Sequence, residues 1–264
     1  MITSTTNKQV KYVSSLVKKA RARREEDLFV AEGLRMCQEI PPERLAALYL
    51  SESVSRTPEG RELAGRTSRV EVVSDEVFRA LSDTQSPQGI LALVRQYHYT
   101  LEDAARTSRD GGGPALIMVL ERLQDPGNLG TILRAGEGAG VTGVLMDRET
   151  ADIYNPKVIR STMGSILRVP FCYTEDLHRD LAALKEKGVT LFAAHLEGKR
   201  SYDQEDYTGD TAFLIGNEAN GLSDGTARLA DTYIRIPMEG AVESLNAAVA
   251  SAVLMFEAAR QRRR

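Results

Sequence analysis

The feature that most limits the fold is the run Leu-Ile-Met-Val-Leu at residues 116–120, which contains no polar residue. A strand with one solvent-facing side alternates apolar and polar residues, whereas a strand covered on both faces is apolar throughout. Such runs favour a parallel sheet with helices on both faces. Ligands of these sheets bind in the loops beyond the carboxyl ends of the strands. We therefore expect an α/β fold, with chemistry in the loops after residues 120, 195, 215 and 236.

The alternation of strands and helices continues to the C-terminus. Short apolar runs predict strands at 116–120, 143–146, 166–171, 190–195, 212–215 and 233–236. Apolar residues at helical spacing predict helices at 131–139, 156–161, 177–187 and 245–260. This second half of the chain is thus expected to form one parallel α/β domain.

The first 97 residues have their own alternation and predict a smaller α/β domain. Expected strands are 28–31, 45–50, 70–73 and 89–94, and expected helices are 7–24, 34–40, 57–64 and 77–81. Residues 96–113 change character and end in Gly111-Gly112-Gly113 before Pro114, which indicates a linker, with a short helix at 101–108. The expected organisation is a domain at 1–97, a linker at 98–113 and a domain at 114–264.

Charge is distributed unevenly along the chain. The net charge is −3, but residues 1–97 carry a balance of +2, and residues 1–24 hold seven Lys or Arg and no acid. A basic helix at 7–24 is either a solvated face or a surface for nucleic acid. In the second case the candidate RNA-binding residues are Lys8, Lys11, Lys18, Lys19 and Arg21.

Cysteine usage and hydropathy narrow the class of protein further. Cys37 and Cys172 are far apart and lack metal-ligand spacing, so we expect two small buried apolar residues and neither a disulfide nor a metal site. No apolar run approaches the roughly 20 residues that span a bilayer, and the N-terminus has no apolar signal core. We expect a cytoplasmic protein without a membrane partner.

The first candidate loop follows residue 120 and contains Pro126, Gly127 and Asn128. Pro126 and Gly127 predict a turn, and Asn128 is placed to cap the helix that follows. Arg134 comes six residues later and is expected to face the same site as Asn128. Taken alone, Asn128 has an ordinary explanation as a helix cap, and Arg134 as a surface residue.

Two further loops follow apolar strands. In the first, Gly216 would let a ligand approach the backbone, and the carboxylate of Glu218 is suited to hold a guanidinium such as that of Arg134. In the second, Ser244 and Asn246 are typical residues for a helix start, and they also suit the orientation of a ribose or phosphate near a helix N-terminus.

The three loops together resemble the signature motifs of the SpoU–TrmH family of RNA ribose methyltransferases over about residues 114–260. The motifs read Asn128-x-Gly130-x-x-x-Arg134, then residues 215–221, Ile-Gly-Asn-Glu-Ala-Asn-Gly, and then Ile236-Pro-Met-x-Gly240-x-x-x-Ser244-Leu-Asn246. Residues 4–33 are similar to the ribosomal-protein-like substrate-binding domain of the family's ribosomal-RNA branch, notably in Asn7-Lys8-x-Val10-Lys11 and Phe29-Val30-x-Glu32-Gly33.

This resemblance implies a deep trefoil knot, a homodimer, S-adenosylmethionine as cofactor and transfer of its methyl group to a ribose 2′-hydroxyl. It implies that Arg134 activates the hydroxyl, either as a base assisted by a substrate phosphate or by orienting the ribose, and that the other motif residues hold Arg134 and the nucleotide. The implied catalytic residues are Arg134, Asn128, Glu218, Ser244 and Asn246. The implied cofactor-binding residues are Ala194, His195, Leu196, Gly216, Asn217, Ile236, Met238 and Leu245.

The extra N-terminal domain favours 23S-type large-subunit ribosomal RNA as the substrate. The alternatives are ribose methylation of tRNA, an antibiotic-resistance modification of ribosomal RNA, and an RNA-binding protein of the same fold without catalysis. A dinucleotide-dependent oxidoreductase is less suitable, because Gly136, Gly138 and Gly140 lie inside a helical pattern with the wrong spacing for that fingerprint.

Overall fold

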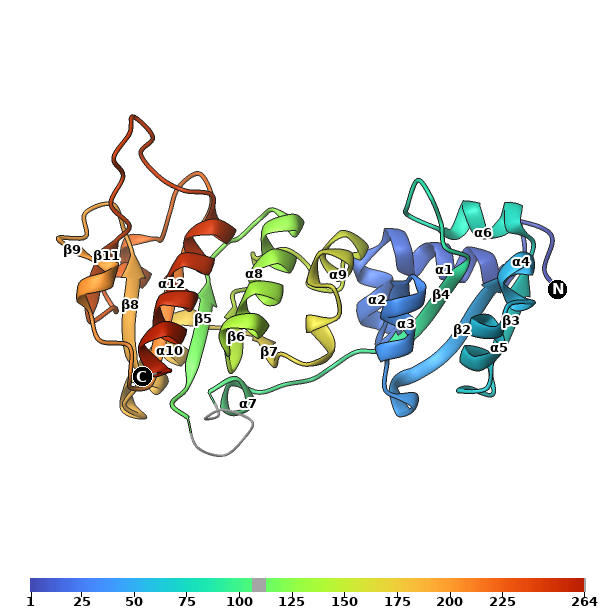
Figure 1. Ribbon diagram of the computed structural model, residues 1–264, viewed down its shortest axis with the longest axis horizontal. Helices are drawn as coiled ribbons and strands as arrows, with labels where there is room; N and C mark the ends of the chain where they lie inside the picture. The colour runs from blue at the N-terminus through green and yellow to red at the C-terminus, as the bar shows by residue number, and fades with distance from the viewer. Residues whose placement is uncertain (106–112, 264) are drawn as a thin grey trace. The chain divides into compact units, whose positions relative to one another are not determined.

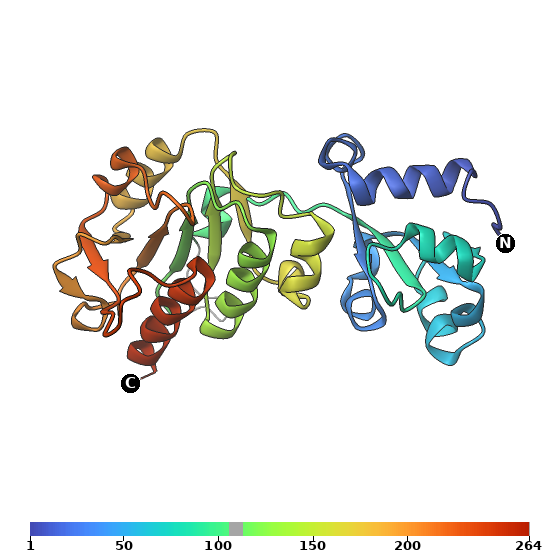
Figure 2. The same ribbon diagram turned by 90° about the horizontal axis from the view of Figure 1, so that it is seen from above.

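The computed structural model describes residues 1–105 and 113–263, and these divide into two compact units (Figures 1 and 2). Unit 1 comprises Met1–Tyr97 together with Asp152–Leu167, and unit 2 comprises the described residues of 98–151 and of 168 onward. Residues 152–167 therefore pack with the N-terminal unit, although in sequence they lie in the middle of the expected C-terminal domain. Residues 106–112 of the expected linker lie outside the described residues.

Unit 1 is built on a mixed four-stranded sheet in the order β1-β4-β2-β3. Strand β4 runs antiparallel to β1 and β2, and β2 runs parallel to β3. Helix α1 packs Val10, Val13 and Leu16 into the core of this sheet. The strands are Leu28–Glu32 (β1), Leu45–Ser51 (β2), Val70–Val73 (β3) and Ile90–Arg95 (β4). The helices are Lys8–Lys18 (α1), Ala20–Glu26 (α2), Leu34–Glu39 (α3), Glu52–Ser55 (α4), Pro58–Ala64 (α5), Asp75–Leu81 (α6) and Pro156–Thr162 (α9), with short turns at Pro42–Arg44 (η1) and Ser165–Leu167 (η2).

The single helix expected at 7–24 is wrong, because the chain breaks at Lys19 into α1 and α2. Lys19 has an extended backbone, with φ −124° and ψ 115°. The guanidinium of Arg23 donates to the carbonyls of Leu16 and Val17 at 2.7 and 3.1 Å. These hydrogen bonds satisfy carbonyls at the end of α1, so the structure around the break is stabilised by tertiary contacts that helical periodicity does not reveal.

Unit 2 is a seven-stranded sheet in the order β7-β6-β5-β10-β8-β11-β9, and every neighbouring pair is parallel. This confirms the expected α/β class. Helices α8 and α12 lie together on one side of the sheet, and α10 and α11 lie on the other (Figure 2). The strands are Leu116–Leu120 (β5), Gly143–Met146 (β6), Phe171–Tyr173 (β7), Thr190–Ala194 (β8), Arg200–Ser201 (β9), Thr211–Ile215 (β10) and Thr232–Arg235 (β11). The helices are Leu101–Ala104 (α7), Pro126–Ala139 (α8), Leu177–Glu186 (α10), Asp224–Ala227 (α11) and Ala247–Arg262 (α12), with a turn at Tyr202–Gln204 (η3).

The strand expected at 166–171 is also wrong. Ile166 belongs to η2 and is buried in unit 1, whereas β7 starts only at Phe171 in unit 2. Pro170 separates the two, because proline has no N–H to donate to a sheet. The apolar residues of this stretch therefore serve two different cores.

Three further expectations concern the cysteines, membrane-spanning helices and the knot. Cys37 and Cys172 are both free and buried, and burial raises the pKa of each thiol to about 12, which confirms their expected role as inert packing residues. In the part of the chain that the structure describes, no helix has the length and apolar character to span a membrane. The trefoil knot stays a prediction.

Candidate active site

Three loops that are distant in sequence are joined by hydrogen bonds at the carboxyl edge of the unit 2 sheet. They follow β5, β10 and β11, and the chain of bonds runs from Glu218 through Asn128 to Asn246. Asn128 Nδ2 donates to Glu218 Oε1 at 3.0 Å, and Asn246 Nδ2 donates to Asn128 Oδ1 at 2.9 Å. The side chain of Asn128 thus links the other two loops through both of its polar atoms.

The carboxylate of Glu218 accepts hydrogen bonds from three neutral N–H donors. It accepts the backbone N–H of Gln124 at 3.1 Å and that of Asp125 at 3.0 Å, in addition to the amide of Asn128. Burial, the largest single influence, raises the pKa of the Glu218 carboxyl, but the three hydrogen bonds together outweigh it and hold the pKa below the ordinary value of 4.5. Glu218 is therefore ionised at neutral pH and serves as an acceptor that fixes backbone.

Asn128 does not cap helix α8, contrary to expectation. The helix begins at Pro126, and Asp125 is the cap: its Oδ1 accepts the N–H of Asn128 at 2.8 Å. Proline suits the first helical position, because the N–H it lacks has no partner within the helix. This early start frees the amide of Asn128 to bind Glu218 and Asn246.

The expected pairing of Glu218 with Arg134 is wrong. Arg134 is exposed, and within residues 1–105 and 113–263 the structure gives it no hydrogen bond or ion pair. Six helical residues advance about 9 Å and leave two side chains roughly 120° apart around the axis, so Asn128 and Arg134 do not share a face. Arg134 is thus exposed on α8 without a hydrogen-bond or ion-pair partner among the described residues.

Asn246 and Ser244 have different roles in the third loop. Asn246 caps α12, and its Oδ1 accepts the N–H of Ala248 at 2.9 Å and of Val249 at 3.3 Å. The Nδ2 of the same side chain donates to Asn128 Oδ1. Ser244 is exposed, and among the described residues its hydroxyl makes no hydrogen bond. The loop thus presents Ser244 to solvent directly beside a fixed helix start.

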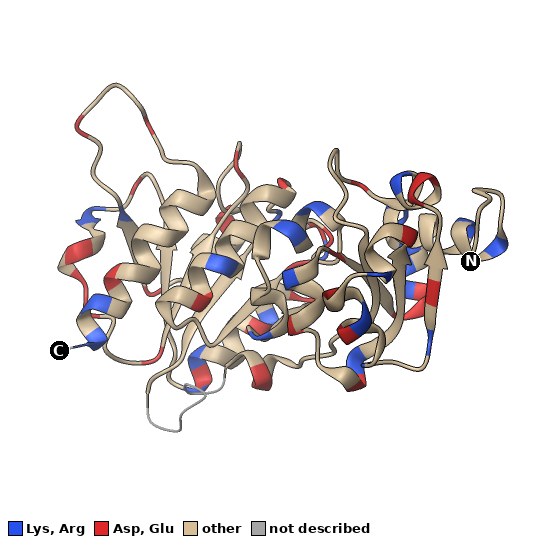
Figure 3. Ribbon diagram, turned by 45° about the vertical axis from the view of Figure 1, so that its right-hand side comes forward, with Lys and Arg blue, Asp and Glu red and all other residues tan. Residues whose placement is uncertain are grey.

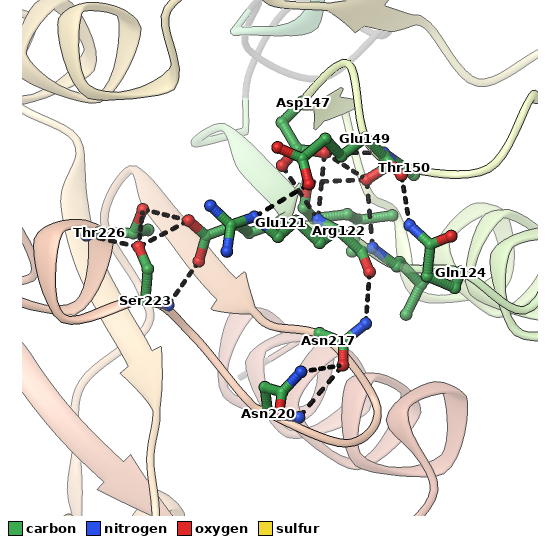
Figure 4. A network of polar contacts seen from close by, with 12 residues as sticks. Glu121, Arg122, Gln124, Asp147, Glu149, Thr150, Asn217, Asn220, Ser223 and Thr226 are labelled. Carbon is green, nitrogen blue, oxygen red and sulfur yellow. Dashed lines mark hydrogen bonds and ion pairs between the residues drawn. The ribbon is translucent and has the colours of Figure 1, made fainter.

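A buried carboxylate that the sequence did not single out anchors the far end of the second loop (Figure 4). Glu121 is only 4% exposed and accepts the N–H and the hydroxyl of Ser223, each at 2.7 Å, and the hydroxyl of Thr226 at 2.7 Å. The near end is held by Asn217, whose Nδ2 donates to the carbonyl of Arg122 at 2.8 Å. The signal that could have identified Glu121 is its position as a charged residue directly after the apolar run 116–120.

Residues 121–125 therefore form one side of the site, and the next loop along the sheet supports them. Arg122 has a left-handed backbone, with φ 55°, which is costly for a residue with a side chain. Its N–H donates to both carboxylate oxygens of Asp147 at 3.0 and 3.1 Å. Leu123 N–H donates to Thr150 Oγ1 at 3.3 Å, and Gln124 Nε2 donates to the carbonyl of Glu149 at 2.5 Å.

Gly216 is required by its own loop, because the backbone across the hairpin leaves no room for a Cβ. A Cβ at this position would lie 2.0 Å from the carbonyl carbon of Gly221 and 2.1 Å from the nitrogen of Leu222. Asn217 and Gly221 close the loop through two backbone hydrogen bonds at 3.0 and 2.9 Å. The loop is therefore a tight hairpin that presents Glu218 at its turn.

The residues named as cofactor contacts lie at or after the ends of three neighbouring strands, β10, β8 and β11. Gly216 follows β10, Ala194 ends β8 and Ile236 follows β11. His195 packs its ring on Tyr233 with centroids 4.9 Å apart and accepts the N–H of Glu197 at Nδ1, which fits a wall residue. Leu196 leaves 69% of its surface exposed. Met238 and Leu245 are half-buried in the third loop, and Asn217 lies in the second.

No cluster of metal-ligating side chains occurs within the described ranges 1–105 and 113–263. The acids of the site, Glu121 and Glu218, are instead occupied by N–H and O–H donors. The polar groups here are thus arranged to hold loops.

The five candidate RNA-binding residues of unit 1 are all exposed: Lys8, Lys11, Lys18, Lys19 and Arg21. Lys11, Lys18 and Lys19 line a surface hollow of about 390 Å³ together with the hydroxyls of Ser14 and Ser15. Arg21 is paired with Glu25 at 2.7 Å. Elsewhere basic and acidic residues are interspersed along the backbone of both units (Figure 3).

Two family models match this chain. Residues 115–256 match the SpoU rRNA Methylase family, and residues 7–92 match an MRM3-like substrate binding domain. The first match covers more than half of the chain and contains all three loops of the site.

Curated relatives and solved structures align with nearly the whole chain. A Bordetella pertussis protein named 23S rRNA (guanosine-2′-O-)-methyltransferase RlmB is 34% identical over 84% of this chain and 91% of its own. A Bacillus subtilis protein named as a 23S rRNA guanosine 2′-O-methyltransferase, RlmP, is 28% identical over 97% of both chains. The crystal structure of an AdoMet-bound rRNA methyltransferase from Sinorhizobium meliloti is 31% identical, with a TM-score of 0.86 over 98% of this chain and 97% of that one.

Proposed function

The chain belongs to the SpoU rRNA methylase family of 2′-O-methyltransferases, and we propose that it methylates a ribose 2′-hydroxyl of 23S-type large-subunit ribosomal RNA. The observation that carries the proposal is the bonded chain Glu218–Asn128–Asn246, which unites the three family motifs at one edge of the sheet. The match of residues 7–92 to a substrate-binding domain supports ribosomal RNA over tRNA.

The ends of β10, β8 and β11 fit S-adenosylmethionine, the methyl donor of this family. Backbone groups near Gly216, Ala194 and Ile236 are available to pair with the edge of an adenine, and exposed Leu196 with half-buried Leu245 supplies aliphatic surface for its faces. When bound, the cofactor supplies an electrophilic methyl group on a sulfonium.

Arg134 is the residue we assign to the ribose hydroxyl. An arginine keeps its proton in nearly all settings, so we assign it the task of orienting the ribose and stabilising the oxygen as negative charge develops on it. The guanidinium is exposed and makes no hydrogen bond or ion pair with the described residues, which leaves it available to RNA. Ser244, exposed beside the start of α12, is assigned to the same nucleotide.

The geometry of the loops is fixed by three side chains, those of Asn128, Glu218 and Asn246. We assign them no direct contact with the guanidinium of Arg134. Each contacts at least one other loop of the site through a hydrogen bond of 3.1 Å or less. Such preorganisation is valuable, because small errors in the placement of reacting atoms cost large factors in rate.

The lysines of α1 are assigned to RNA phosphates. Lys11, Lys18 and Lys19 line one hollow together with Ser14 and Ser15, and three ammonium groups around one hollow suit a phosphate group. Such contacts give affinity without base identity. The choice of nucleotide therefore depends on other parts of the protein.

We also propose that the enzyme acts as a homodimer in the cytoplasm, where the ribosomal RNA of bacteria is found. Val249 and Phe256 lie two turns apart on α12 and are 49% and 44% exposed, and Phe256 adjoins Gly138 of α8, the helix that carries Arg134. A second copy of the chain covering this apolar face would also approach Arg134. Light scattering of the wild type and of Phe256→Glu tests this, and a monomeric wild type would exclude the dimer.

One experiment tests the function. Ribose methylation is mapped across total RNA from cells with and without the gene, and loss of one 2′-O-methyl site in 23S ribosomal RNA is expected. Loss of a tRNA site would instead identify tRNA as the substrate. If no site is lost, the chain is better described as an RNA-binding protein of this fold.

A further inference from the structure

Two consecutive residues, Ala151 and Asp152, are held by different units of the protein. Ala151 is fixed in unit 2, where its N–H donates to the carbonyl of Leu123 at 2.8 Å and its carbonyl accepts the hydroxyl of Tyr173 at 2.6 Å. Asp152 is fixed in unit 1, where its Oδ2 accepts Arg23 Nη2 at 2.5 Å and Nε at 3.1 Å. A single peptide bond, with its Cα atoms about 3.8 Å apart, joins the two anchors.

On the side of unit 1, this anchor leads to the basic helix. Arg23 is only 3% exposed, and the same guanidinium that binds Asp152 donates to the carbonyls of Leu16 and Val17 in the last turn of α1. Lys18, one of the lysines around the hollow, comes directly after Val17. A shift of α1 would therefore be transmitted to Asp152 through one buried side chain.

A second contact keeps the chain after Asp152 in the same place. The hydroxyl of Tyr154 accepts the N–H of Tyr97 at 2.7 Å and donates to the carbonyl of Tyr97 at 3.1 Å. The ring of Tyr154 stacks on Phe29 of β1 with centroids 4.9 Å apart. Asp152 is thus part of a well-packed segment of unit 1 with little freedom to move alone.

On the side of unit 2, the residues just before Ala151 hold the segment that forms the active site. Asp147 accepts the N–H of Arg122, Thr150 accepts that of Leu123, and the carbonyl of Glu149 accepts the amide of Gln124 (Figure 4). The next N–H groups of that segment, those of Gln124 and Asp125, bind Glu218. Contacts therefore run without a gap from Ala151 to the catalytic loops.

We propose that Arg23 and Asp152 are positioning residues. They couple the binding of RNA on α1 to the position of the active-site segment 121–125. The inference rests on the proposed function, because it assigns α1 to RNA and residues 121–125 to the site of methyl transfer. Arginine is suited to this task, since its planar fork fixes direction as well as distance at a carboxylate. Neither residue contacts the nucleotide or the cofactor in this scheme.

The test compares hydrogen exchange and kinetics in the wild type and in Asp152→Asn. A 23S ribosomal RNA transcript is expected to slow amide exchange in residues 121–125 of the wild type. In Asp152→Asn the transcript is expected to bind with unchanged Kd and to protect α1, but the protection of 121–125 is lost. The kcat for RNA is expected to fall by at least about fivefold, the lower end of typical coupling between sites, while the Kd of S-adenosylmethionine stays unchanged.

The matched control is Asp83→Asn. It removes an exposed ion pair of 3.0 Å with Arg160, which also comes from the 152–167 segment of unit 1. This variant is expected to show the exchange pattern and kcat of the wild type. Arg23→Lys keeps the charge but loses the fork, so it is expected to retain the fold and to show reduced protection of 121–125.

Equal protection of residues 121–125 in the wild type, Asp152→Asn and Arg23→Lys overturns the inference, even if all three methylate RNA. Absence of RNA-dependent protection in the wild type overturns it as well. A wild type that shows the protection but methylates no RNA contradicts the proposed function and leaves the link between the two segments standing.

Discussion

Asn128 donates a hydrogen bond of 3.0 Å from its Nδ2 to Oε1 of Glu218, a residue 90 positions further along the chain. Asn128 Oδ1 also accepts a hydrogen bond from the side-chain amide of Asn246. The side chain of Asn128 therefore joins all three loops of the site. The bond between Asn128 and Glu218 is therefore central to the arrangement of the site.

Replacing Glu218 by Gln should lower both activity and stability, with a characteristic dependence on pH. The folded-state pKa of Glu218 lies below 4.5, so its carboxylate contributes stability that is present above that value and is lost as the pH falls through the folded pKa. The difference in free energy of unfolding between wild type and Glu218→Gln should shrink below about pH 4.5. Denaturant unfolding from pH 7 to pH 3 measures it, and a constant difference would contradict the assignment.

Arg134→Ala should abolish methyl transfer without weakening the binding of S-adenosylmethionine. The exposed guanidinium makes no hydrogen bond or ion pair with other described residues, so the free energy of unfolding should change by less than about 0.5 kcal/mol. Calorimetry of cofactor binding and single-turnover methylation separate the two effects. Arg134→Lys keeps a cation and should restore little activity, whereas normal turnover by Arg134→Ala would remove this residue from the mechanism.

Gly216→Ala should distort the second loop, because the new Cβ would lie 2.0 Å from backbone of Gly221. Forced overpacking of this kind costs about 1–3 kcal/mol, and cofactor affinity should fall with it. Gly209→Ala is the matched control, since a Cβ there would meet nothing within 4 Å. Thermal unfolding and cofactor titration of both variants provide the comparison, and similar results for the two would refute the steric argument.

Glu121→Ala should destabilise unit 2 by about 2 kcal/mol, because it leaves the half-buried N–H and hydroxyl of Ser223 and the buried hydroxyl of Thr226 without their acceptor. Glu175→Ala removes a carboxylate that is 70% exposed and paired with Arg148, and it should change stability by less than about 0.5 kcal/mol. Chemical denaturation measures both variants. Equal stability of the two would show that Glu121 does not anchor the loop.

The triple variant Lys11→Ala, Lys18→Ala, Lys19→Ala should weaken RNA binding and reduce its dependence on salt. Each lost phosphate contact lowers the slope of log affinity against log salt by about one. The control is Arg35→Ala, Arg56→Ala, Arg61→Ala, which removes the same charge from exposed positions of α3 to α5. Filter binding at several salt concentrations distinguishes the two, and an equal loss in both would indicate a net-charge effect.

The local character of each segment could be predicted from the sequence, but the partners of the motif residues could not. The run 116–120 predicted a doubly covered strand, and β5 lies in the middle of a parallel sheet. The motif order indicated the family, which the match of residues 115–256 confirms. The sequence nevertheless predicts a helix cap at Asn128 and a pair between Glu218 and Arg134, because spacing along a chain does not reveal which loops meet across strands.

The sequence by itself determined the α/β class, since apolar periodicity acts locally, and the order of its three loop motifs indicated the family and with it the chemistry. Only the tertiary structure decided that Glu218 binds the backbone of residues 124 and 125, that Glu121 anchors Ser223, and that residues 152–167 pack with the N-terminal unit. These contacts join residues separated by up to about a hundred positions. They depend on the register of neighbouring strands and on the burial of whole segments, which no local pattern encodes.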